Sequence, residues 1–218
     1  VLARSLAAAG CDVVLAAGGD GTINQVVQGV AGSGAILGVI PAGLANVWAT
    51  EVSLSARPGA FASLLRDGQV FDTDLGNVNG QRFLVMAGIG FDAAVVAAVT
   101  AKAKARWGQL AYVAAAARIA AGWRAPAATV TIDGELLDVG QLLGAIVANA
   151  SRYAGVFDLS PASRLDDGLF EMLVYRDRGL ALRARSMLLA DHRVRRWDGC
   201  VTTVAGQHIS IDCASPLP

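Results

Sequence analysis

Two continuous apolar runs, separated by a helical stripe, begin the pattern along this chain. Residues 13–17 carry only apolar side chains, which predicts a strand buried on both faces, as in a parallel sheet. Apolar residues then recur at the spacing of one helix face: Ile23, Val26, Val27 and Val30. A second apolar run covers residues 35–40. Strand, helix and strand within about 30 residues predict a βαβ unit with a right-handed crossover.

A loop rich in small or polar residues follows each predicted strand. Gly18-Gly19-Asp20-Gly21-Thr22 follows the first strand, and Pro41-Ala42-Gly43-Leu44-Ala45-Asn46 follows the second. Thr22 and Gln25 have the spacing of a capping box, so we expect Thr22 to cap the intervening helix. The carboxyl ends of neighbouring parallel strands form the edge at which open α/β sheets bind ligands.

Two more helices are expected before the pattern changes. One begins at about Asn46, and the other runs from about Pro58 to Arg66, with Gly68 placed to end it. We place a domain boundary near Gly68 to Asp72. This division gives an α/β domain over residues 1–70 and a second domain over residues 71–218.

The second domain has the pattern of an antiparallel sheet with accessory helices. Asn79-Gly80 and Asp133-Gly134 each separate two apolar segments, and both dipeptides favour tight hairpin turns. Further strands are expected at residues 169–175 and 200–204. Helices are expected at about Ala93–Trp123, with a break near Gly108, and at Leu180–His192.

Composition narrows the classes of protein. Eighteen basic and eighteen acidic residues give no net charge, which argues against a nucleic-acid binder driven by bulk positive charge. Residues 21–50 carry no charge, yet glycine, asparagine and glutamine interrupt them, so we interpret them as buried α/β core rather than a membrane span. Three cysteines and two histidines match no zinc motif or disulfide framework, and a reducing, cytoplasmic setting is the simplest interpretation.

The first glycine loop has the outline of a phosphate site. Glycines let backbone N–H groups approach an anion, and a helix N-terminus attracts it. Asp20 would repel a bare phosphate but fits a site in which Mg²⁺ lies between carboxylate and phosphate. A tight turn with a capping aspartate is the alternative interpretation. Neither the Walker A pattern nor the dinucleotide fingerprint is present.

Four segments together resemble the diacylglycerol kinase catalytic-domain family, which includes bacterial lipid kinases and sphingosine kinases. They are the two loops above, Ala87-Gly88-Ile89-Gly90-Phe91-Asp92-Ala93, and Leu165-Asp166-Asp167-Gly168-Leu169. The resemblance covers essentially the whole chain. It implies a partial Rossmann-like α/β domain, of the kind shared with NAD kinases, followed by an antiparallel β-sandwich, with ATP in the cleft between them.

The resemblance also assigns roles to residues. Asp20 would organise metal and nucleotide, and Asp74 would join a carboxylate–water–Mg²⁺ network, so both are candidate catalytic residues. The candidate nucleotide-binding residues are Gly18, Gly19, Asp20, Gly21, Thr22, Asn24, Gly43 and Leu44. A structural Mg²⁺ would be held by the Asp167 carboxylate and by the main-chain carbonyls of Arg164 and Leu169, although a simple turn also explains Asp167-Gly168.

Two departures from the family pattern stand out. Leu44 replaces the usual threonine or serine, whose hydroxyl can donate to a phosphate oxygen. The family's general base is a glutamate in an Asp-Gly-Glu segment near the C-terminus, and we find none there before Pro218. Asp133-Gly134-Glu135 is explained by its hairpin turn. We therefore expect a fragment, truncated at both ends, with at most trace kinase activity.

The function that the resemblance implies is ATP-dependent phosphorylation of a lipid hydroxyl, as in phospholipid biosynthesis. The substrate would be diacylglycerol-like, and the protein would be cytoplasmic and peripheral, touching the membrane surface transiently. An NAD kinase-like enzyme and a non-catalytic nucleotide- or lipid-binding homologue remain alternatives, and a homodimer remains open. Several residues could line an acyl-chain groove, or could equally be ordinary core: Trp107, Leu110, Tyr112, Val113 and Ile119.

Overall fold

The computed structural model describes residues 2–55, 57–153, 157–160, 162–180, 183, 193 and 200–218. The chain forms two compact units. Unit 1 comprises Val1–Met86, Asn149–Val156 and Arg164–Asp167, and unit 2 comprises Ala87–Ala148, Phe157–Ser163 and Gly168–Pro218. Both units therefore contain segments that are distant in the sequence.

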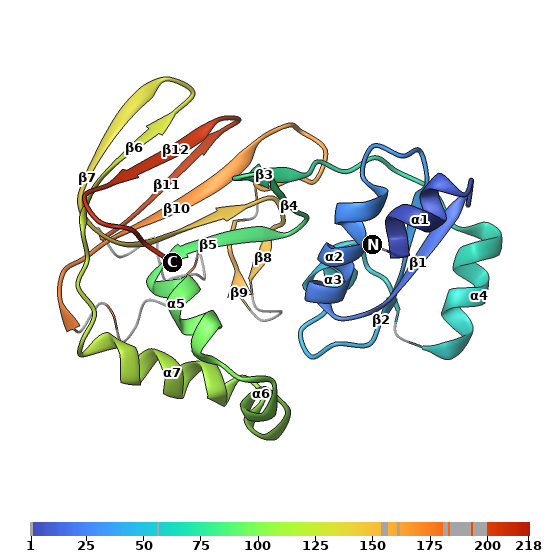
Figure 1. The fold of residues 1–218 in the computed structure, drawn as a ribbon, viewed down its shortest axis with the longest axis horizontal. Helices are drawn as coiled ribbons and strands as arrows, with labels where there is room; N and C mark the ends of the chain where they lie inside the picture. Colours follow the sequence, from blue (N-terminus) through green and yellow to red (C-terminus); the bar gives the residue numbers. More distant parts are fainter. Residues whose placement is uncertain are drawn as a thin grey trace. The chain divides into compact units, whose positions relative to one another are not determined.

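Unit 1 is built on the expected βαβ unit (Figure 1). Strands β1 (Val13–Gly18) and β2 (Ile36–Pro41) pair in parallel, and α2 (Asp20–Val30) connects them. Helix α1 (Leu2–Ala8) packs against α2. Because the register places Gly18 opposite Pro41, the loops that follow β1 and β2 leave the same edge of the sheet.

The remaining elements of unit 1 enclose a small apolar core. They are α3 (Val47–Glu51), α4 (Pro58–Asp67), β3 (Gly76–Val78), β4 (Gln81–Phe83) and β8 (Arg152–Tyr153). Asn79 and Gly80 connect β3 to β4 with φ angles of 50° and 81°, as the predicted hairpin turn requires. The buried core consists of Ala16, Ile23, Val27, Val39, Trp48 and Leu84.

Unit 2 contains the predicted antiparallel sheet, with strand order β11-β10-β7-β6-β12 and with β5 also paired to β7 (Figure 1). The strands are β5 (Met86–Gly90), β6 (Ala127–Ile132), β7 (Glu135–Ala148), β10 (Phe170–Arg176), β11 (Val201–Gly206) and β12 (Ile209–Cys213). A further short strand is β9 (Phe157–Asp158). Asp133 and Gly134 have φ angles of 50° and 90°, which confirms the second predicted hairpin turn.

Three helices replace the broken helix expected over residues 93–123. They are α5 (Phe91–Ala98), α6 (Ala101–Trp107) and α7 (Leu110–Ala120). Gly108 ends α6 as predicted, but the chain also leaves the helix after α5, where Thr100 caps α6 by accepting a hydrogen bond from the Ala103 N–H (3.2 Å). Of the helix predicted at Leu180–His192, only residues 180 and 183 lie within the described residues.

The charge-free stretch of residues 21–50 folds into most of α2, all of β2 and most of α3. This arrangement agrees with its interpretation as α/β core. Within the part of the chain that the structure describes, none of the helices combines the length and hydropathy needed to cross a bilayer.

Candidate functional site

The two glycine loops at the end of β1 and β2 touch each other. The Ala42 N–H donates to the Gly18 carbonyl oxygen (3.0 Å), and a Cβ placed on Gly19 would lie 3.0 Å from the Cα of Gly43. A Cβ placed on Gly43 would collide with the Gly19 backbone. Only two residues without side chains can approach so closely. The structure therefore brings together the two loops that the sequence singled out.

The N-terminus of α2 lies in the first loop and presents unpaired donors. Gly19 is the N-cap and contributes no side-chain hydrogen bond, so the prediction that Thr22 caps the helix is wrong. The helix begins three residues earlier than expected, because its N-cap is Gly19 and not Thr22, and the Thr22 side chain instead packs on Gly18. Among the described residues, none accepts a hydrogen bond from the backbone N–H groups of Gly19, Asp20 and Gly21. Three successive donors at a helix N-terminus can hold an anion.

Asp20 connects the two loops. Its Oδ1 accepts a hydrogen bond from the Trp48 N–H (3.0 Å), which belongs to the first turn of α3. Asp20 is thus a capping residue, but it caps α3, whose Trp48 lies 28 residues further along the sequence. No described residue is bonded to Oδ2, which leaves one carboxylate oxygen for a ligand. The capping and metal-binding roles are therefore compatible.

Asn46 closes the second loop from within. Its φ angle of 47° is left-handed, its Oδ1 accepts from the Gly43 N–H (2.8 Å), and its Nδ2 donates to the Gly43 carbonyl oxygen (2.9 Å). The Gly43 N–H donates to Asn46 and is therefore not available to a ligand. Gly43 contributes to the site only through its lack of a side chain. Leu44 is 54% exposed and carries no polar group.

Asn24 points its amide at the backbone around β4. Its Nδ2 donates to the Arg82 carbonyl oxygen (3.2 Å), and its Oδ1 accepts from the Leu84 N–H (3.2 Å). Gln28, one turn later, forms a matching pair with both backbone groups of Arg82 (2.7 and 3.0 Å). These bonds fasten α2 to the hairpin. The sequence did not indicate this structural role for Asn24, and phosphate contact by its side chain stays a prediction.

Asp74 lies where three separated segments of unit 1 meet. Its N–H donates to the Leu165 carbonyl oxygen (2.7 Å), and its own carbonyl oxygen accepts from Asn149 Nδ2 (2.8 Å). Asn149 is fully buried and also donates to the Leu84 carbonyl oxygen (3.0 Å). Its Oδ1 is buried and has no hydrogen-bond partner among the described residues. A buried oxygen of this kind is normally satisfied by water or an ion.

Asn149 was missed by the sequence analysis. The signal that could have identified it is its position: Asn149 is the first polar residue after the apolar run of residues 142–148. All residues of this run are buried. A polar residue that remains buried at the end of such a run needs hydrogen-bond partners. Asn149 finds two of them in backbone carbonyl groups next to a predicted catalytic aspartate.

The three predicted structural Mg²⁺ ligands, Arg164, Asp167 and Leu169, are all exposed. The Arg164 Nε donates to Asp166 Oδ1 (3.2 Å), and this bond raises the pKa of Arg164. Asp167 is exposed and belongs to unit 1, whereas Leu169 belongs to unit 2. Within the described ranges, no three His, Cys, Asp or Glu side chains group closely enough to hold a metal ion. The ligand set Arg164, Asp167 and Leu169 stays a prediction.

The oxygen chemistry of unit 1 nevertheless fits Mg²⁺. Asp20 Oδ2 and Asn149 Oδ1 both lack a bonded partner among the described residues, and both are hard oxygen donors. Mg²⁺ prefers oxygen ligands and retains several waters. These two oxygens could therefore bind a hydrated magnesium ion, either directly or through one of its water molecules.

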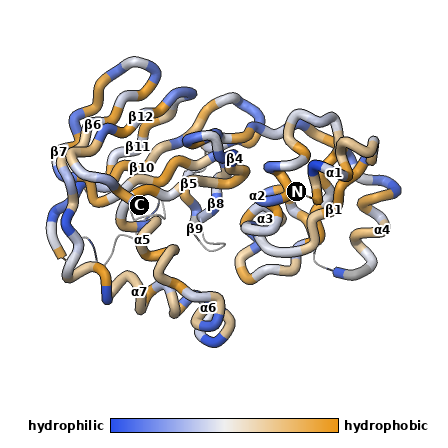
Figure 2. The backbone as a smooth tube through the Cα atoms, viewed as in Figure 1, coloured by the Kyte–Doolittle hydropathy of each residue, from blue (hydrophilic) through white to orange (hydrophobic). Residues whose placement is uncertain are grey.

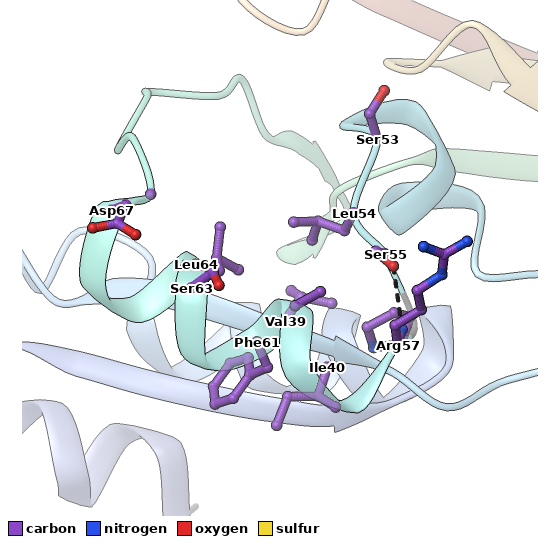
Figure 3. A pocket seen from close by; sticks show the side chains of 13 residues that line it. Val39, Ile40, Ser53, Leu54, Ser55, Arg57, Phe61, Ser63, Leu64 and Asp67 are labelled. Carbon is purple, nitrogen blue, oxygen red and sulfur yellow. Dashed lines mark hydrogen bonds between the residues drawn. The ribbon is translucent and has the colours of Figure 1, made fainter.

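A pocket of about 530 Å³ lies beside the end of β2 and was not predicted from the sequence (Figure 3). Its floor is apolar and is formed by Val39, Ile40, Leu54, Phe61 and Leu64. Leu54 and Leu64 point into the open space, and the Arg57 N–H donates to Ser55 Oγ (3.2 Å) at one side. None of the predicted site residues lines this pocket.

Comparisons with known proteins agree with this architecture. The family model described as the diacylglycerol kinase catalytic domain matches residues 1–78, and that of the YegS C-terminal NAD kinase beta sandwich-like domain matches residues 85–218. A diacylglycerol kinase of Bacillus subtilis is 32% identical over 188 residues, which cover 84% of this chain and 62% of that protein. A probable lipid kinase YegS-like of Pseudomonas aeruginosa is 34% identical over 174 residues, covering 77% of this chain and 55% of that protein.

A solved structure shows the same fold. The crystal structure of a diacylglycerol kinase from Bacillus anthracis superposes with a TM-score of 0.75 and covers 98% of this chain and 71% of that one, at 22% identity. This likeness confirms the α/β and antiparallel architecture. The chain spans less than two thirds of the length of the curated relatives above.

Proposed function

Because the chain belongs to the diacylglycerol kinase catalytic-domain family, we propose that it transfers the γ-phosphate of ATP to the hydroxyl group of a diacylglycerol-like lipid. One observation of the structure carries the proposal. Within the described part of the chain, the N–H groups of Gly19, Asp20 and Gly21 and the Oδ2 of Asp20 have no hydrogen-bond partner, and all of them belong to the start of α2. A triphosphate with its metal ion needs donors and an acidic oxygen at the same place.

The donors fit the anionic part of ATP. The N–H groups of Gly19, Asp20 and Gly21 belong to the first turn of an 11-residue helix, whose dipole favours negative charge at that end. The close approach of Gly19 to Gly43 keeps side chains away from these donors. In this account Gly18 to Thr22 bind the phosphates, and Gly43 and Leu44 form the neighbouring wall.

Mg²⁺ would supply charge neutralisation on the transferring phosphoryl group. Asp20 would hold it through Oδ2 while Oδ1 remains on the Trp48 N–H. Asp74 and the buried Asn149 Oδ1 would hold water of the same network. The structural ion that the resemblance implies at Arg164, Asp167 and Leu169 belongs to this proposal as well.

The decisive experiment is a kinase assay with labelled ATP and Mg²⁺. The enzyme is the purified protein encoded by the full reading frame that contains these residues. Diacylglycerol in mixed micelles and soluble NAD are offered in separate reactions. We expect label in the lipid extract and none in the NAD fraction. Label in NAD would replace the proposal with an NAD kinase-like function, and nucleotide binding without any transfer would favour a non-catalytic homologue.

Asp20→Asn gives this assay a specific control. The variant retains an oxygen that can accept from the Trp48 N–H but loses the negative charge, so we expect a folded protein whose transfer rate falls about 100-fold. Asp12→Asn makes the same charge change at an exposed position before β1 and should leave the rate unchanged. Equal rates for the two variants would remove Asp20 from the reaction.

A further inference from the structure

Glu51 is the one titratable side chain between Asp20 and Arg57 in the sequence, and the proposed reaction does not use it. It is the last residue of α3, and its carboxylate reaches a segment 100 residues further along the chain. Oε1 accepts a hydrogen bond from the backbone N–H of Ser151 (3.2 Å), and Oε2 accepts one from the Ser151 hydroxyl group (3.0 Å). Both carboxylate oxygens therefore bind the same residue.

The position of Glu51 does not favour α3 itself. A carboxylate in the last turn of a helix meets the negative end of the helix dipole, and this turn contains no basic residue. The chain becomes hydrophilic at β8, which begins with Arg152 (Figure 2). Within the described ranges, however, no ion pair joins Glu51 to a basic side chain. The two hydrogen bonds to Ser151 are thus the contacts that explain a glutamate at this position.

Ser151 ends a short segment whose backbone is held at every residue. The N–H groups of Asn149 and Ala150 both donate to the Val85 carbonyl oxygen (2.9 and 3.2 Å). The next N–H, that of Ser151, is the one that Glu51 binds. Asn149 is fully buried, and its Oδ1 has no hydrogen-bond partner among the described residues. Glu51 therefore anchors the far end of the segment that carries this oxygen.

Helix α3 joins this anchor to Asp20, whose Oδ2 is likewise without a partner in the described part of the chain. In the first turn of α3 the Trp48 N–H donates to Asp20 Oδ1 (3.0 Å), and at the last residue Glu51 binds Ser151. Trp48 belongs to the buried core of unit 1, and α3 has only 5 residues. Because a packed helix of this length moves as one body, a displacement of its last residue also displaces its first turn.

We propose that Glu51 and Ser151 form a positioning pair for the magnesium-bound nucleotide. The pair holds α3 against the Asn149 segment and so keeps Asp20 Oδ2 and Asn149 Oδ1 in fixed places. Neither member of the pair touches the nucleotide or the ion. Oxygens that are already fixed bind an ion more tightly than oxygens that must first be ordered. The inference rests on the proposed function, because it concerns the oxygens that we assign to Mg²⁺ and its water.

The first readout needs neither ATP nor Mg²⁺. In ¹⁵N spectra of the protein encoded by the full reading frame, Glu51→Ala should shift the side-chain amide signals of Asn149 and the backbone amide signal of Trp48. Glu51→Gln keeps an acceptor for the Ser151 N–H and a donor for its hydroxyl oxygen, so these signals should stay at their parental positions. Glu135→Ala truncates an exposed glutamate of unit 2 in the same way and should also leave them unchanged.

The second readout is the Mg²⁺ dependence of phosphoryl transfer, measured where circular dichroism shows every variant to be folded. Glu51→Ala should raise the Mg²⁺ concentration for half-maximal rate about tenfold and leave the KM for the lipid unchanged. Glu51→Gln and Glu135→Ala should stay within about twofold of the parent. A structural role alone would lower the stability of Glu51→Ala without moving the Mg²⁺ dependence of the folded protein.

Ser151 provides an independent test of the pair. Ser151→Ala removes the hydroxyl group but keeps the backbone N–H bond to Glu51, so the Mg²⁺ concentration for half-maximal rate should rise only about threefold. In the double variant Glu51→Ala, Ser151→Ala the rise should equal that of Glu51→Ala alone, because the hydroxyl group has then already lost its acceptor. Additive effects would assign the two side chains separate roles and overturn the pair.

Two further results would overturn the proposal. In one, Glu51→Ala leaves the Asn149 and Trp48 signals unchanged; in the other, these signals move but the Mg²⁺ dependence does not. Failure of the proposed function has a different signature, since the parent itself then transfers no label. The amide signals of the Glu51 variants would still report whether the pair positions Asn149.

Discussion

The edge of unit 1 at which the loops after β1 and β2 meet (the loop edge) and the surface of helices α6 and α7 in unit 2 use side chains in opposite ways. At the loop edge, polar side chains are consumed by internal backbone contacts: Asp20 caps α3, Asn46 closes its own loop, and Asn24 binds β4. On α6 and α7, large apolar side chains are left in solvent while alanines fill the interior. The role of a residue is therefore predicted less reliably by its type than by the partners that its side chain has or lacks in the fold.

The strongest way to break the loop edge is to separate its two loops. Gly43→Ala places a methyl group against the Gly19 backbone and the Asn46 side chain, so we expect the free energy of unfolding to fall by about 3 kcal/mol. Gly59→Ala is the matched control, because a Cβ there meets no atom within 4 Å in α4, and it should be neutral or stabilising by up to about 1 kcal/mol. Urea unfolding followed by circular dichroism measures both variants. Equal midpoints would show that the loops are not packed as described.

The next test concerns the support beneath α7. Arg183 donates to Asp177 (2.6 and 3.1 Å) and to the carbonyl oxygen of Ala120, the last residue of α7 (3.1 Å), and the two charged side chains are only 17% and 10% exposed. Asp177→Ala leaves the guanidinium without its counter-ion and should cost about 3 kcal/mol of stability. Asp67→Ala breaks the exposed pair with Arg66 and should cost less than about 0.5 kcal/mol.

This pair also predicts a pH dependence. The hydrogen bond from Arg183 holds the pKa of Asp177 below its ordinary value. The contribution of this ion pair to the free energy of unfolding is therefore present above the unfolded-state pKa of aspartate, about 4. It is lost as the pH falls through the lower pKa of Asp177 in the folded state. The stability difference between the parent and Asp177→Ala should be constant from pH 5 to 7 and shrink below about pH 4. A difference that instead grew in acid would contradict the assignment.

A substitution at Asn24 can separate two roles of its side chain: holding α2 against β4 and contacting the nucleotide directly. Asn24→Ala leaves the Leu84 N–H and the Arg82 carbonyl oxygen unpaired, and we expect a loss of about 2 kcal/mol in stability. Asn77→Ala, at an exposed position of β3, is the control. Calorimetric titration of the folded variant should give a Kd for Mg·ATP within about threefold of the parent. A weakened Kd at unchanged stability would instead restore the direct phosphate contact that the family resemblance implies.

The smallest effect is expected at Leu44. Because this side chain is 54% exposed, Leu44→Thr should leave the melting temperature unchanged. Its new hydroxyl can donate to a phosphate oxygen, and one such bond should lower the Kd for Mg·ATP about two- to tenfold. Leu44→Val has nearly the same shape without the hydroxyl and should bind as the parent does. Equal gains in both variants would mean that shape, not hydrogen bonding, limits affinity.

Most of the fold was predictable because its signals are local. Asn79-Gly80 and Asp133-Gly134 adopt the positive φ angles that their hairpin turns need, and the apolar runs form β1 and β2 where expected. The break after α5 was not foreseen, since Thr100 interrupts an alanine-rich sequence that otherwise favours helix. Its capping hydrogen bond makes the interruption a helix start.

The site was only partly predictable because its contacts are long-range. The sequence placed the two glycine loops at one sheet edge, which the parallel register confirms. It could not show that Asp20 caps α3 instead of Thr22 capping α2, nor that Asn149 binds the Asp74 carbonyl oxygen 75 residues away. Spacing within one helix or hairpin carries no information about partners brought together by the rest of the fold.

The central claim is that the start of α2 binds a magnesium-bound triphosphate. Titration of ¹⁵N-labelled protein with Mg²⁺ and a non-hydrolysable ATP analogue measures this directly. The account predicts saturable shifts that are largest at the amides of Gly19, Asp20 and Gly21 and that vanish when Mg²⁺ is removed. Shifts centred on the pocket beside α4, or shifts at the α2 start that do not depend on Mg²⁺, would contradict it.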